Sequence, residues 1–156
     1  YTVDDLDNAL HAMQDKIDTL KKSASSKQAR IKEVDELLRM VDYYKSGKPA
    51  ADKLKSIRFE KSRQKYKAEH DDELRTFYMA ERKLKPHFKG GKLPITAWRK
   101  ERAQLEQDCK DIQTELSPLH ADAKKLWAIH YNIYEVQHEQ ERQNTATRQK
   151  RQEIEH

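Results

Sequence analysis

A stretch of apolar residues near the start of the chain constrains its fold most strongly. Between residues 6 and 41 the apolar positions recur at alternating steps of four and three, with an interruption at Lys27. This spacing keeps the side chains on one narrow stripe of an α-helix, as in a coiled-coil seam. The stripe comprises Leu6, Leu10, Met13, Ile17, Leu20, Ala24, Ile31, Val34, Leu38 and Val41. Such a stripe has to be covered, so we expect a second helix against it.

A second stripe with the same rhythm lies near the other end of the chain, interrupted at Arg102 and His130. It comprises Trp98, Leu105, Cys109, Ile112, Leu116, Leu119, Ala123, Leu126 and Ile133. We therefore predict an all-α fold, in which two long helices form an antiparallel coiled-coil hairpin with a small basic helical lobe at the tip. The predicted hairpin spans 1–142, the lobe is inserted at 47–95, and 143–156 is a polar tail, frayed or disordered.

The composition favours long exposed helices with a thin core. Charged residues make up 38% of the chain and hydrophobic residues 35%, with only 3 Gly and 4 Pro. Disorder is the competing interpretation of so much charge, and the regular stripes argue against it outside the tail. No apolar run approaches the roughly 20 residues that a membrane span needs. The single cysteine, Cys109, allows no intramolecular disulfide. Both features suit a cytoplasmic protein.

Several signals predict where the helices begin and end. Thr2 and Asp5 are spaced as a capping box, so a helix is expected to start at once, as in a domain excised from a longer protein. Gly47 and Pro49 predict that this helix stops near residue 45 and that a short helix runs to about residue 56. A further helical pattern covers 59–88, with a break near residue 70 where Asp71 is expected to cap a new helix.

The last long helix is expected to run from about Thr96 to about Glu141. Pro118 lies inside it and predicts a kink, although the apolar stripe continues in phase beyond it. Trp98, Trp127, Tyr131 and Tyr134 lie at helical spacing and are interpreted as packing residues.

The positive charge is concentrated in the predicted lobe. Residues 47–100 contain 16 basic and 7 acidic residues, a balance of +9. Residues 1–46 contain 8 basic and 9 acidic residues (−1), and residues 101–156 contain 8 and 11 (−3), which together give the net +5 of the chain. Cations clustered beside Phe59, Tyr66 and Phe88 would attract a nucleic-acid backbone. The candidate DNA-binding residues are Lys53, Lys55, Arg58, Lys61, Arg63, Lys65, Lys67, Lys89, Lys92, Arg99 and Lys100. The alternative is a solvated helical face without a partner.

The sequence offers no catalytic constellation, and we expect neither a metal nor a cofactor. The seven histidines do not form the i, i+4 pair of a helical zinc site, and His70 and His130 are interpreted as packing residues. The Tyr43–Tyr44 doublet lacks the nearby metal ligands or general acid that DNA cleavage by tyrosine requires, so one of the two is expected to pack. By itself this chain is not expected to be an enzyme.

Three short motifs carry a family resemblance: HDDEL at 70–74, AER at 80–82 and GKLPITAW at 91–98. With the upstream run DELLRMVDYYKSGKP at 35–49, this region resembles the C-terminal part of relaxases, the mobilization nucleases of conjugative transposons in Gram-positive bacteria. The likeness extends over nearly the whole chain, although its coiled-coil portions are unspecific. It implies a parent that nicks one DNA strand through a catalytic domain N-terminal to this chain, and it assigns no catalytic residue here.

Two hypotheses follow for this chain. The first is an accessory module whose basic lobe binds DNA near the origin of transfer, with weak sequence preference because phosphate contacts do not read bases. The second is a protein-interaction or homodimerisation module that recruits other conjugation proteins. Neither hypothesis involves a membrane.

Overall fold

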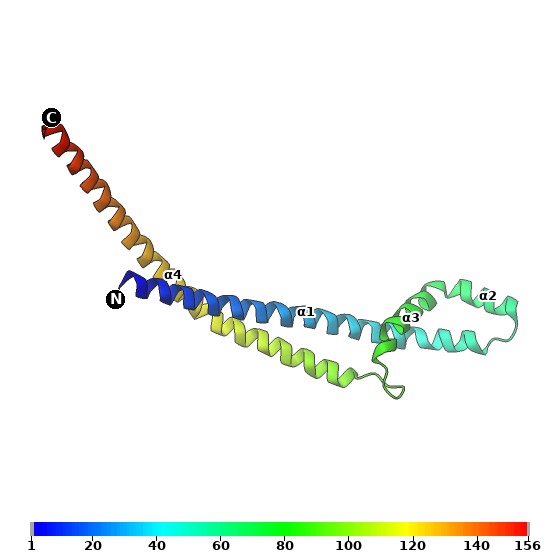
Figure 1. The fold of residues 1–156 in the computed structure, drawn as a ribbon. Coiled ribbons are helices and arrows are strands. Elements are labelled where there is room, and N and C mark those ends of the chain that lie inside the picture. The colour runs from blue at the N-terminus through cyan, green and yellow to red at the C-terminus, as the bar shows by residue number, and fades with distance from the viewer. Residues whose placement is uncertain (1, 156) are drawn as a thin grey trace. The chain divides into compact units, whose positions relative to one another are not determined.

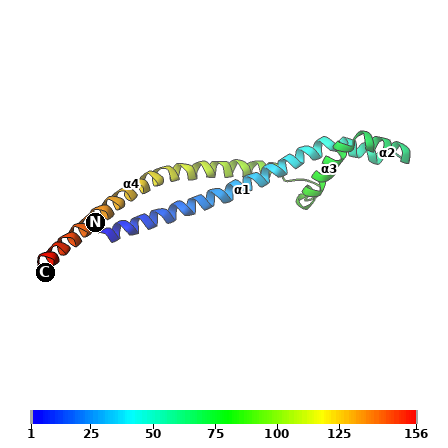
Figure 2. The same cartoon turned by 90° about the horizontal axis from the view of Figure 1, so that it is seen from above.

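The fold is all-α, as predicted. In a computed structural model, which describes residues 2–155, two long helices pack antiparallel and short helices lie between them in sequence (Figures 1 and 2). The elements are α1 (Val3–Ser56), α2 (Glu60–Glu69), α3 (Asp71–Leu84), the 3₁₀ helix η1 (Lys85–His87) and α4 (Ile95–Glu155). None of the helices within 2–155 is long and apolar enough to cross a membrane.

Contacts divide the chain into two compact units. The terminal unit comprises Tyr1–Ala24 and Lys110–His156, and the central unit comprises Ser25–Cys109. In the terminal unit the start of α1 packs against α4 through a core of Ile17, Ile112, Leu116 and Ala123. The predicted capping box is confirmed, because the Thr2 backbone N–H donates to Asp5 Oδ2 and the Asp5 N–H donates to Thr2 Oγ1, each at 3.1 Å.

The central unit has two apolar clusters, both of which involve α1 and α3. The first joins α1, α3 and the first turn of α4 through Val34, Met40, Val41, Ala80, Leu84 and Trp98. The second joins the last turns of α1 to α3 through Ala50, Ala51, Leu54, Leu74 and Phe77. The residues of both predicted stripes are buried or half-buried, which confirms the stripes.

The two polar interruptions in the central unit each meet an acidic residue of the opposite helix. Lys27 Nζ lies 3.2 Å from Asp108 Oδ2, and the Arg102 guanidinium donates to Asp35. From Lys27 to Asp35 along α1, the partner on α4 moves back from Asp108 to Arg102, which is the signature of antiparallel helices. A charge within a seam costs stability unless it is paired, so these pairs favour one register over its alternatives.

The third interruption also meets an acidic residue of the opposite helix, within the terminal unit. His130 Nε2 lies 2.8 Å from Asp7 Oδ1, so this histidine packs between the helices as predicted.

The predicted end of the first helix near residue 45 is wrong, because α1 continues through Gly47 and Pro49 to Ser56. Gly47 is buried where α3 crosses, and a Cβ there would lie 2.6 Å from Phe77 Cβ and 3.3 Å from the Glu73 carbonyl oxygen. The glycine therefore permits close helix packing and does not end a helix. A helix-interior proline costs about 3 kcal/mol. The buried residues that follow Pro49 offset that cost by packing on α3.

Other helix limits are confirmed in part. The break near residue 70 is confirmed, but the N-cap of α3 is His70 and not Asp71, and its side chain makes no capping hydrogen bond. α4 passes through Pro118 without a break. The predicted end near Glu141 is wrong, because α4 extends to residue 155 with every side chain from 143 to 154 exposed. That this segment frays in solution stays a prediction.

The packing interpretation of the aromatic residues is confirmed for Trp98, which is 5% exposed, and wrong for the other three. Trp127, Tyr131 and Tyr134 are each half exposed or more. They lie about 100° around α4 from the stripe positions Leu126, His130 and Ile133, since each residue turns the helix by that angle. Regular spacing alone did not reveal on which side of the helix its partner lies.

Candidate nucleic-acid interface

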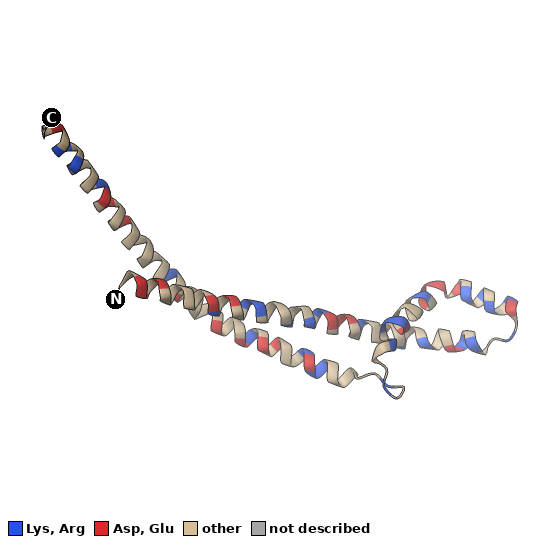
Figure 3. Cartoon of the chain, viewed as in Figure 1, with Lys and Arg blue, Asp and Glu red and all other residues tan. Residues whose placement is uncertain are grey.

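Seven of the eleven candidate cations gather around one helical turn-back in the central unit. There the last turns of α1 lead through a short loop, residues 57–59, into α2, which runs back alongside α1 (Figure 1). We call this group the tip cations; all are exposed, and they are Lys53, Lys55, Arg58, Lys61, Arg63, Lys65 and Lys67. Figure 3 shows the basic residues on both helices of this turn-back.

The four cations of α2 lie on both flanks of a helix that buries no residue. Lys61 and Lys65 are four residues apart and share one side, whereas Arg63 and Lys67 share another. Between these pairs, Tyr66 turns toward the second apolar cluster and is half-buried against it. α2 thus contacts the second apolar cluster through Tyr66 and presents cations on two sides.

Within residues 2–155, no carboxylate oxygen lies within 4 Å of the charged nitrogen atoms of any tip cation. Lys53 instead places its Nζ 5.4 Å from the centre of the Tyr66 ring. The neighbouring Arg75 differs, because Asp71 and Asp72 lie 3.1 and 2.6 Å from its guanidinium and offset its positive charge. The hydrogen bond to Asp72 and the charge of Asp71 raise the pKa of Arg75, so its guanidinium stays protonated within this group. The tip cations therefore keep their charge available for an external anion.

One aromatic side chain projects beside these cations. Phe59 follows Arg58 in the loop, precedes α2 as its N-cap residue, and is 78% exposed. Tyr66 and Phe88, by contrast, are half-buried against the apolar clusters. Sequence reasoning placed all three beside the cations but did not distinguish them. An exposed aromatic ring among cations can stack on an unpaired base while the cations hold the backbone.

The remaining four candidate cations form a second group, away from α2. Figures 1 and 2 both place the loop between η1 and α4 apart from α2. Lys89 and Lys92 face each other across this loop and exchange backbone hydrogen bonds of 2.9 and 3.1 Å. Gly90 and Gly91 form the turn with φ of 59° and 77°, as a two-residue hairpin requires. Arg99 and Lys100 follow on the exposed face of α4.

The tyrosine doublet divides as predicted. Tyr44 packs, with its ring centre 5.0 Å from that of Phe77 and 5.8 Å from that of Phe88. Tyr43 is 38% exposed on α1. His70 stacks on Tyr66 with ring centres 4.1 Å apart, so its predicted packing role is also confirmed.

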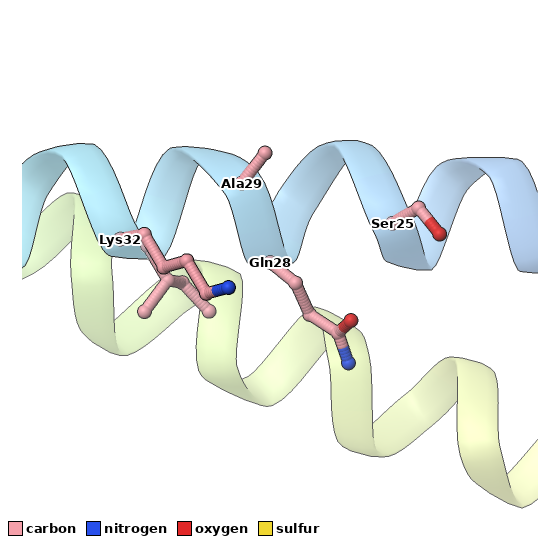
Figure 4. A pocket seen from close by; sticks show the side chains of 5 residues that line it. Ser25, Gln28, Ala29 and Lys32 are labelled. Carbon is pink, nitrogen blue, oxygen red and sulfur yellow. The ribbon is translucent and has the colours of Figure 1, made fainter.

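The central unit also carries an open groove of about 460 Å³ on α1 (Figure 4). It is lined by Ser25, Gln28, Ala29, Ile31 and Lys32. This lining holds one cation and neither a carboxylate nor a histidine, so it assembles no acid–base pair. Within residues 2–155, no three His, Cys, Asp or Glu side chains lie close enough together to hold a metal ion.

Comparison with known proteins found no match: no family model, no curated protein and no solved structure resembles this chain at a significant level.

Proposed function

We propose that this chain is an accessory, non-catalytic module of a conjugative relaxase that binds DNA near the origin of transfer through the tip cations. The observation that carries the proposal is seven exposed cations without carboxylate partners around one exposed phenylalanine. Phosphate contacts release condensed counterions, and this release supplies most of the sequence-independent affinity for DNA. The module therefore holds DNA for the catalytic domain with weak sequence preference.

The relaxase assignment is supported by the three motifs, each of which contributes a core residue of the central unit. HDDEL supplies Leu74, AER supplies Ala80 and GKLPITAW supplies Trp98, which are 2%, 0% and 5% exposed. The motifs thus specify how α3 and α4 pack on α1. A resemblance in these residues therefore supports a similar fold. The DNA contacts are proposed on other grounds, which are the exposure and the charge of the tip cations.

The test is fluorescence anisotropy of labelled single-stranded, duplex and hairpin DNA with the whole chain. Reversing three tip cations in Lys61→Glu/Arg63→Glu/Lys65→Glu should weaken binding roughly ten- to a hundredfold at low salt. A matched control reverses three exposed cations of α1, in Lys16→Glu/Lys21→Glu/Lys22→Glu, and changes net charge equally. Equal losses in both variants would mean that overall charge attracts the DNA, and no loss in the first would remove the tip from the interface.

Phe59 permits a second test within the same assay. Because its ring is exposed, Phe59→Ala should leave the helical content and the unfolding temperature unchanged. Loss of one base–aromatic stack costs about 1–3 kcal/mol, so affinity for single-stranded DNA should fall by roughly five- to a hundredfold, with duplex affinity retained. Unchanged affinity for single strands would show that Phe59 does not stack on a base.

A further inference from the structure

One segment of α4 in the terminal unit has an unusual surface. Residues 126–134 contain no Asp, Glu, Lys or Arg, the longest such run in a chain of which 38% is charged. Trp127, Tyr131 and Tyr134 within it are 50%, 61% and 50% exposed. We call these three residues the aromatic stripe. Exposed aromatics gathered on an otherwise highly charged helix indicate an interaction surface.

The aromatic stripe is separate from the packing against α1. His130 on the α1 side is held by Asp7, and Leu126 and Ile133 are half-buried on that same side. The stripe residues follow one another at steps of four and three, so they form a second seam beside the first. This seam has the spacing that another helix would need in order to insert its side chains.

The charges on either side of the stripe indicate the direction of that helix. Lys124 and Lys125 precede the uncharged run, whereas Glu135, Glu139 and Glu141 follow it. Two copies aligned in parallel would place lysines beside lysines and glutamates beside glutamates. Two antiparallel copies would place the lysines of each beside the glutamates of the other, so the segment is complementary to itself in that orientation alone.

We propose that the aromatic stripe binds the same stripe of a second copy of this chain in antiparallel orientation. Trp127 of one copy faces Tyr134 of the other, and the two Tyr131 rings lie beside the symmetry axis. In this register Lys124 lies level with residue 137 of the other copy, between Glu135 and Glu139. Glu139 also pairs with Arg142 of its own helix at 3.2 Å, so Glu135 is the principal partner of Lys124.

The exposed area sets the strength of this association. A large aromatic side chain buries about 150–250 Å² when covered, so three half-exposed rings from each copy supply roughly 600 Å² in total. Stable interfaces bury about 1,200 Å² or more. The dimer is therefore weak and dissociates on dilution, with a dissociation constant that we expect in the micromolar range.

Sedimentation equilibrium of the whole chain across that range is the direct test. The wild type should pass from monomer to dimer, and Tyr131→Glu should stay monomeric at every concentration while keeping its helical circular dichroism. Gln143→Glu, an exposed control on α4 outside the stripe, should dimerise as the wild type does. A monomeric wild type up to about millimolar concentration, or a dimer that Tyr131→Glu does not affect, would overturn the proposal.

Charge exchange tests the orientation. Lys124→Glu should weaken the dimer several-fold, and adding Glu135→Lys and Glu139→Lys to it should restore the dimer. In a parallel dimer each charge faces its own copy, so the single reversal would leave the repulsion unchanged. A dimer that is insensitive to Lys124→Glu, or not restored by the exchange, would contradict the antiparallel arrangement. The DNA-binding proposal concerns the central unit and is unaffected by either result.

Discussion

Replacing Gly47 by alanine separates local helix propensity from tertiary packing. Gly47 lies within α1, where alanine is favoured over glycine by about 1 kcal/mol. Judged by propensity alone, Gly47→Ala should therefore stabilise the protein. The structure gives the opposite expectation, because Gly47 is buried against α3.

The size of the effect follows from the contacts that the new methyl group would make. It would lie 2.6 Å from Phe77 Cβ, well inside contact distance, and 3.3 Å from both Phe77 Cγ and the Glu73 carbonyl oxygen. Phe77 Cβ cannot move without its backbone, so α3 has to shift away from α1. Overpacking of this kind costs about 1–3 kcal/mol. For a contact as short as 2.6 Å we expect the upper part of that range, about 2–3 kcal/mol. Subtracting the propensity gain of about 1 kcal/mol leaves a net loss of about 1–2 kcal/mol, or roughly 2–8 °C in unfolding temperature.

The assay is thermal and urea unfolding followed by circular dichroism. Ser46→Ala provides the control, since Ser46 precedes Gly47 on α1 and is exposed. It should change stability by less than about 0.5 kcal/mol. A Gly47→Ala protein as stable as the wild type or more stable would show that α3 does not approach α1 as closely as described, and would refute the packing argument.

Two further predictions concern an ion pair and a turn of the central unit. A hydrogen bond from Arg30 lowers the pKa of Glu101 below its ordinary value of 4.5, so the pair stabilises the fold above that pH and is lost as pH falls through the lowered pKa. Between about pH 5 and pH 3, the free energy of unfolding measured in urea should therefore fall by up to about 1 kcal/mol more in the wild type than in Glu101→Gln. Equal decreases in the two proteins would show that the pair does not contribute to stability. Gly91→Val should lower the free energy of unfolding by about 1–2 kcal/mol, because a φ of 77° is unfavourable for a β-branched residue. Gly91→Asn should lower it less, since asparagine tolerates this conformation better. Equal stabilities of the two variants would contradict the left-handed conformation of Gly91 in this turn.

The apolar periodicity predicted the architecture because both stripes are local patterns that any antiparallel pair has to bury. The three polar interruptions were visible in the sequence as exceptions at Lys27, Arg102 and His130. Their partners were not, since Asp108, Asp35 and Asp7 belong to the distant helix and become neighbours only once the register is fixed.

The errors at Gly47 and at the aromatic residues of α4 have one physical origin, which is packing by a distant segment. Gly47 carries the signal of a helix end, and the approach of α3 gives it another role. Trp127 and Tyr131 carry the signal of a buried seam, but α1 packs on a neighbouring side of α4. In the candidate interface, the sequence identified the cations and their local excess. It did not indicate that they divide into two groups, or that Phe59 projects where Tyr66 packs.

The salt dependence of DNA binding tests the central claim most directly. For a labelled oligonucleotide titrated by anisotropy, the slope of log K against log salt reports the number of phosphates that the protein neutralises. If all seven tip cations contact phosphates, the slope should be about −5 for single strands and about −6 for duplex. Lys61→Glu/Arg63→Glu/Lys65→Glu should reduce its magnitude by about 2–3. No binding at low salt, or a slope that this variant leaves unchanged, would contradict the account.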